Sequence, residues 1–338
     1  MAFGRRSFLG SALAGAAAVR RARAAAGAAP PPGARRHALP DAPRPPAQST
    51  VAVVRTAAFG TLREALAEAV RLAGGLAFVR PGDRVLLKPA VNSGNRYPAT
   101  TDAEVVALVA AMVREAGGHP LVADRTMFLR STRTAFERTG ILEAARAAGM
   151  PCLALDGAEE VTIEHPLAAH WSGARVRVYR AVAEADHVVD LCTPRTHALA
   201  GFTMGLKNLV GVVAGSARPG MHLGAGFVPR VAEIAAVVRP ALTLLDGRLG
   251  FADGGPDEGD LVRPGLVAAS TDPLALDALG VAALRLAGTN DAIGRGPVWS
   301  LPLLRRAAEI GVGVAEGARI RIAGLAAADE VALRARLG

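Results

Sequence analysis

The sequence predicts an α/β fold in which mainly parallel, Rossmann-like sheets are flanked by helices. From residue 51 onward, short runs rich in Val, Leu and Ile alternate with segments that repeat apolar residues at helical spacing. Polar residues follow directly after several apolar runs, which is where ligands bind in open parallel sheets. The predicted strands are 51–54, 84–88, 120–123, 152–155, 175–179, 187–191, 241–245 and 265–269, and the predicted helices are 61–73, 102–116, 133–148, 203–213, 228–238, 272–287 and 301–310.

Two of the helix starts are specified by their first residues. Thr101 and Glu104 have the Thr-x-x-Glu spacing of a capping box. Asp272 precedes Pro273, which places a capping acid before a proline at the first helical position. Both patterns predict that a helix begins within a residue or two of these positions.

The first 49 residues differ from the rest in composition. Residues 1–48 hold eight arginines and one acid, so they carry most of the net charge of +9 of this 338-residue chain. The pair Arg5-Arg6, followed by a weakly apolar Ala- and Gly-rich run, predicts a twin-arginine export signal over residues 1–26. Seven prolines without apolar periodicity predict a linker over residues 27–49. We therefore expect the twin-arginine translocation machinery as a partner and a periplasmic or otherwise exported location.

The remaining residues, 50–338, are expected to form an α/β domain with two possible lobes, 50–185 and 186–338, around a cleft. The apolar run of the signal is too short for a stable transmembrane anchor. With 4% aromatic residues and no basic run, nucleic-acid binding is not expected. Cys152 and Cys192 have no CxxC spacing, so no iron–sulfur cluster is expected, while a disulfide and two free thiols both stay open, with free thiols favoured.

Lysine is rare in this chain. Only Lys88 and Lys207 are lysines among the 39 basic residues. An ammonium is compact and loses its proton when desolvated, whereas a guanidinium stays charged. The two lysines are therefore candidates for positions that need a point charge, a nucleophilic amine or an acid–base amine, with chance survival as the alternative.

Two histidines flank the second lysine. His197 lies ten residues before Lys207, and His222 lies fifteen residues after it. The first follows a predicted strand, the lysine falls in a predicted helix and the second follows a glycine-rich turn, so all three can reach one cleft. We predict all three as catalytic residues and the two histidines as candidate metal ligands, with a hydrogen-bonded structural role as the alternative for each histidine.

A further group of polar residues predicts contacts to a small anionic substrate, because cationic and amide side chains donate hydrogen bonds to carboxylates. The predicted substrate-binding residues are Lys88, Asn92, Arg195, Asn208, Arg218 and Asp246. Asp246 is included because it ends a strand. The acidic residues of the loop 253–260 are instead expected to be solvated, since their spacing matches no calcium-binding loop.

Five blocks of the sequence follow one another in a known order. They are LLKPAVNSGNRYPATTDAEVVALVAAMVREAGGHPLVADR, VVDLCTPRTHALAGFTMGLKNLVGVV, RPGMH, LLDGRLGFADGGP and ASTDPLALDALG. In this order they resemble the bacterial and archaeal family called domain of unknown function 362, over roughly residues 50–310. Some relatives carry iron–sulfur cysteine motifs, and these are missing from this sequence.

The chain is also distantly similar to the nickel-pincer lactate racemases, in which a nucleotide-fold half is followed by a histidine, a lysine and a further histidine at these spacings. The resemblance implies that Lys207 holds a cofactor. It also implies that His197 and His222 bind nickel or another transition metal, or move a proton or hydride at a hydroxy-acid carbon. The upstream histidine of that family is replaced at residues 124–126 by Asp-Arg-Thr, and the approach to the lysine at 204–206 is Met-Gly-Leu.

These observations lead to one main functional hypothesis and two alternatives. The main hypothesis is an exported enzyme that acts on a small anionic substrate, a carboxylate or hydroxy acid, in a metal- or cofactor-dependent reaction of the racemase or isomerase type. The first alternative is a periplasmic anion-binding or accessory module without catalysis. The second is a structural domain in a membrane-associated assembly.

Overall fold

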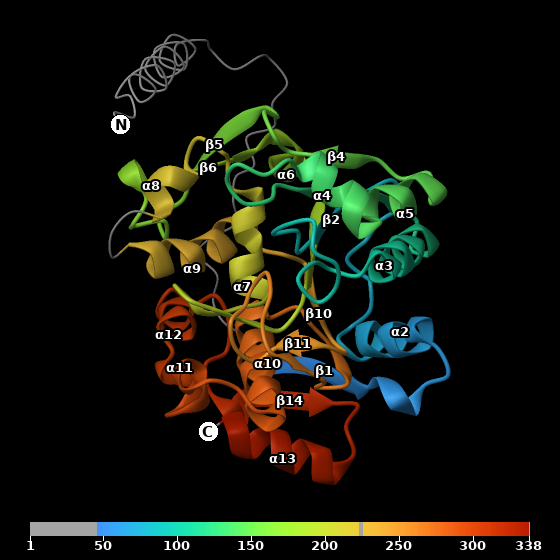
Figure 1. Ribbon diagram of the computed structural model, residues 1–338, viewed down its shortest axis with the longest axis vertical. Helices are drawn as coiled ribbons and strands as arrows, with labels where there is room; N and C mark the ends of the chain where they lie inside the picture. Colours follow the sequence, from blue (N-terminus) through green and yellow to red (C-terminus); the bar gives the residue numbers. More distant parts are fainter. Residues whose placement is uncertain (1–45, 223–225, 338) are drawn as a thin grey trace, which may run out of the picture. The chain divides into compact units, whose positions relative to one another are not determined.

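The computed structural model describes residues 46–222 and 226–337, and these form a mixed α/β fold around an eight-stranded sheet (Figure 1). The predicted signal at 1–26 and most of the predicted linker lie outside the described residues. The strand order is β14-β1-β13-β10-β7-β2-β3-β4. The bounds are β1 Ser49–Arg55, β2 Arg84–Pro89, β3 His119–Asp124, β4 Cys152–Ala154, β7 His187–Cys192, β10 Leu242–Gly247, β13 Leu266–Ser270 and β14 Ile320–Ala323.

The main sheet is mostly parallel, as predicted. Strand β13 is antiparallel to both of its neighbours, β1 and β10, and every other adjacent pair in this sheet is parallel. The predicted fold class is therefore confirmed. The two anticipated lobes share this one sheet, since β1 to β4 come from residues 50–185, apart from the first residue of β1, and β7, β10, β13 and β14 come from 186–338.

Both faces of the sheet are buried, which explains why its strands read as continuous apolar runs. Successive side chains of a strand point to opposite faces. Val51 and Val53 pack in one apolar cluster with α9 (Phe227–Val238), α10 (Pro273–Ala287) and α12 (Pro302–Glu309). Ala52 and Val54 pack in a second cluster with α2 (Leu62–Leu72) and α3 (Ala103–Glu115). Figure 1 shows these two groups of helices on opposite sides of the sheet.

Two smaller sheets were not foreseen. The predicted strand 175–179 is β6 (Arg175–Tyr179), but it pairs with β5 (Glu160–Glu164) in a separate antiparallel hairpin instead of joining the main sheet. A four-stranded sheet is formed by β12 (Leu261–Val262), β11 (Gly250–Phe251), β8 (Arg195–His197) and β9 (Gly201–Thr203). Strands of two or three residues are too short to show the alternation by which strands are recognised in a sequence.

Two predicted helices are broken. The segment 133–148 forms α4 (Thr132–Thr139) and α5 (Ile141–Ala147), because Gly140 between them has a φ of 83°. The segment 203–213 forms a single α-helical turn, α7 (Gly205–Asn208), followed by a 3-10 helix (Leu209–Val212). The remaining helices of the described residues are α6 (Arg180–Ala183), α8 (Arg218–His222), α11 (Asp291–Gly294) and α13 (Ala327–Leu337), with short 3-10 helices at Thr56–Ala58, Ser172–Ala174, Val298–Ser300 and Gly317–Arg319.

One of the two predicted helix caps is correct and the other is not. Asp272 caps α10 by accepting a hydrogen bond from Ala275 N–H at 2.9 Å. The cap of α3 is Asp102, whereas the Thr101 hydroxyl accepts from Ala90 N–H and donates to Leu191 O. Thr101 therefore ties the chain after β2 to β7 and takes no part in a capping box.

The two cysteines are free thiols. Cys152 begins β4 and is half-buried, and Cys192 ends β7 and is buried. Strands β2 and β3 lie between β7 and β4, so the two cysteines are separated by three strand spacings, or about 14 Å across the strands alone, which is beyond the reach of a disulfide. Within residues 46–222 and 226–337, no helix is long and apolar enough to cross a membrane.

Candidate functional site

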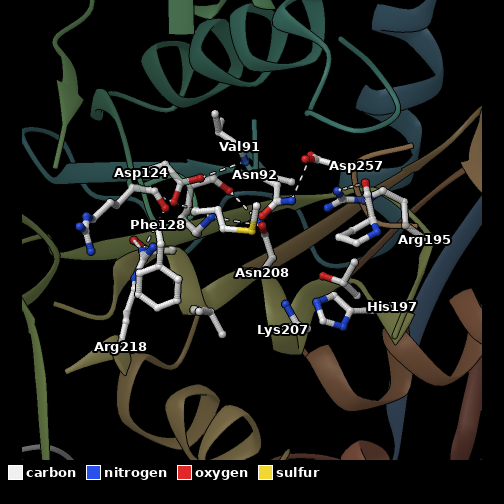
Figure 2. Close-up of a pocket in the computed structure, with 18 of the residues that line it drawn as sticks. Val91, Asn92, Asp124, Phe128, Arg195, His197, Lys207, Asn208, Arg218 and Asp257 are labelled. Atoms are coloured by element: carbon white, nitrogen blue, oxygen red, sulfur yellow. Dashed lines mark hydrogen bonds and ion pairs between the residues drawn. The ribbon is translucent and has the colours of Figure 1, made fainter. Parts of the chain in front are cut away.

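A cavity of about 210 Å³ lies beyond the carboxyl ends of β2, β3 and β7, next to α7 and α8 (Figure 2). These three strands are parallel, so their carboxyl ends meet at one edge of the sheet. The cavity is lined by eight of the nine residues that the sequence singled out. They are Lys88, Asn92, Arg195, His197, Lys207, Asn208, Arg218 and His222.

The ninth predicted residue, Asp246, lies elsewhere. Its carboxylate accepts hydrogen bonds from the Tyr97 hydroxyl at 3.0 Å and from the Arg248 guanidinium, which also pairs with Asp102. Asp246 is fully buried and does not line the cavity. It lies in the last two residues of β10, at the strand end as expected, but its carboxylate binds Tyr97 and Arg248 and does not reach the cavity.

The floor of the cavity is a buried ion pair. Lys88 Nζ lies 2.9 Å from Asp124 Oδ1, and it also donates to Pro89 O at 2.5 Å and to Asn208 Oδ1 at 3.2 Å. Asp124 further accepts from Val91 N–H at 3.0 Å. Burial raises the pKa of Asp124, and the attraction of Lys88 opposes that rise. All three donor positions of the Lys88 ammonium have acceptors, so it is a structural cation.

Gly211 allows the Lys88–Asp124 ion pair to lie close to the backbone that follows Lys207. A Cβ at Gly211 would lie 2.7 Å from Lys88 Nζ and would overlap Asp124 Oδ1. Gly211 belongs to the 3-10 helix that directly follows α7. Only a residue without a side chain fits here, because the neighbouring groups are buried and held by hydrogen bonds.

Asn208 connects this ion pair to a second buried acid. Its amide nitrogen donates to Asp190 Oδ1 at 2.7 Å, while its amide oxygen accepts from Lys88. The other carboxyl oxygen of Asp190 has no hydrogen-bond partner within the described residues. Burial raises the pKa of Asp190 well above its ordinary value, and the nearby charge of Lys88 and the hydrogen bond from Asn208 oppose that rise.

Lys207 lies one residue before Asn208 on α7, and Asp277 of α10 holds the start of that helix. The Asp277 carboxylate accepts from Gly205 N–H at 2.8 Å and from Leu206 N–H at 3.0 Å. Burial raises the pKa of Asp277 to about 7, against the effect of these two donors. Asp277 thus fixes the backbone from which Lys207 extends into the cavity.

The Lys207 amine has no hydrogen-bond or ion-pair partner among the described residues. Its nitrogen lies 5.9 Å from the centre of the Phe227 ring, and Figure 2 shows it beside the imidazole of His197. Burial, together with the positive charges of Arg195, Arg218 and Lys88, lowers the pKa of Lys207 to about 7. A substantial fraction of this amine is therefore unprotonated at neutral pH.

The two histidines have different tautomers, which their hydrogen bonds determine. His197 Nδ1 accepts from Leu199 N–H at 3.1 Å and from Ala200 N–H at 3.3 Å. The proton of the neutral His197 ring must therefore sit on Nε2. His222 Nδ1 lies 2.8 Å from Arg218 O, and because a carbonyl oxygen only accepts, Nδ1 donates and Nε2 keeps a free lone pair.

Both histidines are neutral near pH 7. Burial, assisted by Lys207 and Arg195, lowers the pKa of His197 to about 3. Burial also lowers the pKa of His222, with Lys207 adding to the effect and the carbonyl of Arg218 opposing it. His197 can therefore donate a hydrogen bond from Nε2, and His222 can accept a proton at Nε2.

The pair of histidines does not fit a metal ion. Ligation by His197 Nε2 would move its proton to Nδ1, toward which two backbone N–H groups already point. The nearby carboxylates are engaged, with Asp124 on Lys88 and Asp257 on Arg130. In the described part of the chain, no group of three or more His, Cys, Asp or Glu side chains can hold a metal ion.

Two buried guanidinium groups give the cavity an excess of positive charge. Arg195 donates to Ala99 O at 2.6 Å, and its Nε has no partner among the described residues. Arg218 is held by carbonyl oxygens alone, those of Thr126, Val213, Arg125 and Gly211. Burial lowers the pKa of each to about 10, so both stay charged at pH 7. Neither pairs directly with a carboxylate within the part of the chain that the structure describes, so the cavity suits an anion.

Among the lining residues that were not predicted as site residues, Asp257 and Phe128 are of interest for the chemistry of the cavity. Asp257 was expected in a solvated loop, but it lines the cavity, accepts from Asn92 at 3.0 Å and pairs with Arg130 at 2.6 Å. Phe128 lines the opposite wall, and its ring lies 5.1 Å from that of His222. No local motif marks either residue, because each reaches the cavity through a long-range contact.

The fold and the cavity define an α/β protein with a cation-lined cavity at the carboxyl ends of its parallel strands. The chain belongs to the family described as domain of unknown function (DUF362), which matches residues 85–282. The family predicted from the sequence is thus confirmed. The thylakoid-associated protein sll1697 of Synechocystis sp. is 36% identical over 238 residues, which cover 68% of this chain and 72% of that protein.

Among solved structures, the chain is similar to the lactate racemase apoprotein from Thermoanaerobacterium thermosaccharolyticum. The sequence identity is 15% and the TM-score is 0.44, and the similarity covers 71% of this chain. This chain spans 57% of that protein, which is less than two thirds of its length.

Proposed function

We propose that the cavity is the active site of an enzyme that binds a small carboxylate, such as a hydroxy acid, and moves a proton at the carbon next to the carboxylate. One observation carries this proposal. The Lys207 amine, with a pKa lowered to about 7, has no acceptor among the described residues. It faces a cavity lined by two guanidinium groups that pair with no carboxylate of those residues. An amine that titrates near neutral pH can both accept and donate a proton.

In this proposal, different residues of the cavity bind the substrate and transfer the proton. Arg195 and Arg218 supply the positive charge that attracts a carboxylate. His197 Nε2 donates a hydrogen bond to a substrate oxygen. Lys207 and His222 Nε2 are the two groups that take up or return a proton. Racemisation or isomerisation needs such a pair, since one group removes a proton and another replaces it.

The competing function is an anion-binding module without catalysis. It is favoured by Arg218, whose guanidinium is fixed by four backbone carbonyls and so presents charge without any need to move. The two functions differ in one measurable respect. A binding module needs only the charge of Lys207, whereas an acid–base catalyst needs an amine that loses its proton.

The test combines binding with proton exchange. Thermal unfolding of the purified chain is followed with lactate, other 2-hydroxy carboxylates and glycerol, and exchange of the C2 hydrogen into D2O is followed by NMR. Carboxylates but not glycerol should raise the melting temperature, and Lys207→Arg should retain this shift but lose exchange. The exposed Arg63→Met is the matched control and should keep both.

Two results would decide against the enzyme. If carboxylates stabilise the chain and no C2 hydrogen exchanges, the binding module is correct. If Lys207→Arg exchanges as fast as the native chain, then Lys207 is not an acid–base group. A chain that no small carboxylate stabilises would overturn both functions.

Export is proposed as well, on the basis of the amino-terminal sequence. Residues 1–26 would direct the chain to the twin-arginine translocation machinery, and residues 27–49 would act as the linker. A fusion of residues 1–49 to a reporter that folds before export should reach the periplasm. Replacing Arg5 and Arg6 by lysine should block it, whereas the same change at Arg35 and Arg36 should not.

A further inference from the structure

We infer that Lys207 forms an imine with the carbonyl carbon of a small 2-oxo acid bound in the cavity. The inference rests on the proposed function, because it places the same carboxylate between the same cations. It goes further by naming the substrate class, a 2-oxo acid, and a covalent step.

The two lysines of the chain differ in the one property that an imine requires, a free lone pair. Lys88 Nζ is bound by Asp124, Pro89 and Asn208, and the side chain is 1% exposed. Lys207 Nζ has no acceptor within the described residues, lines the cavity and lies over the face of the Phe227 ring. Only the second amine can attack a carbonyl carbon.

The surroundings of Lys207 keep its amine nucleophilic. Burial and the charges of Arg195, Arg218 and Lys88 lower its pKa to about 7. Desolvation and nearby cations are the two means by which proteins activate a lysine for imine formation. The same cations also attract the carboxylate of the substrate. They therefore serve both to bind the substrate and to activate the Lys207 amine.

The remaining polar groups match the proton transfers of the step. The Lys207 lone pair forms a bond to the carbonyl carbon, and the carbonyl π electrons move to oxygen, which His197 Nε2–H stabilises by a hydrogen bond. His222 Nε2 takes a proton from the nitrogen and returns it to this oxygen. The nitrogen gives up its second proton in the same way, water leaves, and the C=N bond forms. Amine and ketone thus yield imine and water without any oxidant, reductant or further reactant.

The volume and lining of the cavity suit a short 2-oxo acid. The volume is about 210 Å³, and the apolar side chains of Val91, Val210 and Phe128 contribute to its lining. A carboxylate fits the guanidinium groups, and a methyl or short alkyl group fits the apolar wall. A second carboxylate would lie against the carboxylates of Asp124 and Asp257, which also line the cavity.

Reductive trapping tests the inference directly. The full chain is incubated with pyruvate and sodium cyanoborohydride, and the adduct is located by peptide mass spectrometry. The expected adduct adds the mass of pyruvic acid less one oxygen to the peptide that contains Lys207. Acetone, which lacks the carboxylate, should give far less adduct, and excess lactate should compete with pyruvate.

Two variants keep the test independent of folding. Lys207→Arg retains the charge and Lys207→Met retains the length of the apolar stem, and neither should be modified at position 207. Each is first checked for a native-like melting transition, and Lys207→Arg should still be stabilised by pyruvate. The exposed Arg63→Met control should be trapped to the same extent as the native chain.

The outcomes separate the inference from the proposed function. An adduct on Lys207 that lactate prevents supports the inference. An adduct found only on Lys88 or on the amino terminus overturns it, as does stabilisation by pyruvate without any adduct, in which case the carboxylate enzyme stands without an imine. If neither lactate nor pyruvate stabilises the chain, the inference and the proposed function both fail.

Discussion

Lys88 Nζ and Asp124 Oδ1 lie 2.9 Å apart, and both side chains are 1% exposed. Removing one partner of a buried pair leaves an uncompensated charge. We expect Lys88→Met to lower the free energy of unfolding by about 3–5 kcal/mol, measured by urea denaturation. The exposed Arg63–Glu115 pair is the control, and Arg63→Met should cost about 1 kcal/mol or less. Equal losses in the two variants would contradict the structural role of Lys88.

The close approach of Gly211 gives a second prediction. A Cβ there would lie 2.6 Å from Lys88 Cε and would displace the ion pair. Gly211→Ala should therefore destabilise the chain by about 1–3 kcal/mol and weaken carboxylate binding. Gly220→Ala, where nothing lies within 4 Å, is the control and should not destabilise the chain. Thermal unfolding with and without lactate measures both effects.

The lowered pKa of Lys207, about 7, predicts how stability varies with pH. Between about pH 7 and pH 10 the unfolded chain binds more protons at this lysine than the folded chain, so its contribution to stability rises with pH. Lys207→Met should therefore be more stable than the native chain at pH 7, by up to about 4 kcal/mol, and this advantage should shrink toward pH 10. Urea unfolding at several pH values measures the difference in free energy of unfolding between the variant and the native chain. A difference that does not change with pH would show that the pKa of Lys207 is not lowered.

Asp190 predicts a change of the opposite sign. Its pKa is raised in the folded chain, so above about pH 4 the folded state holds a proton that the unfolded state releases, and stability falls as pH rises. Asp190→Asn imitates the protonated acid, so it should lose less stability than the native chain as the pH rises above about 4, which urea unfolding at several pH values measures. Unfolding of the exposed Asp260→Asn control should follow the native pH dependence.

The histidine tautomers predict a spectroscopic result. Nitrogen-15 NMR of imidazole groups distinguishes protonated from unprotonated ring nitrogens. His197 should show its proton on Nε2 and His222 on Nδ1, and His197 should stay neutral down to pH 5 because its pKa is lowered to about 3. A His197 ring with a proton on Nδ1 would remove the argument against a metal ligand at this position.

Much of the fold follows from local sequence. The apolar runs of β1, β2, β3, β7, β10 and β13 appear where expected, because strands buried on both faces need no polar alternation. The short strands β8, β9, β11 and β12 exist only through their pairing with one another, which no local pattern reveals. Gly140 broke one predicted helix through its positive φ, a feature that tertiary context decides.

In the candidate site too, some residues could be predicted from local sequence and others depend on contacts that only the fold shows. Lys207 stood out because lysine is rare in this chain, and its neighbours followed from their places at strand ends. Asp246 was predicted in the cavity and lies outside it, because its carboxylate binds Tyr97 and Arg248. Asp257 was predicted in a solvated loop and lines the cavity, where it binds Asn92 and Arg130. Only the fold shows these partners. Hydrogen-bond geometry, and not residue type, separated the two histidines.

The strand order has a consequence for biosynthesis. β1 is the first strand of the described residues, yet its two neighbours in the sheet, β13 and β14, are among the last elements of that part of the chain. The pairing of β1 with β13 and β14 joins residues far apart in the sequence, so it is slow, and it cannot begin before β13 and β14 have left the ribosome. A nascent or truncated chain therefore keeps both edges of β1 open.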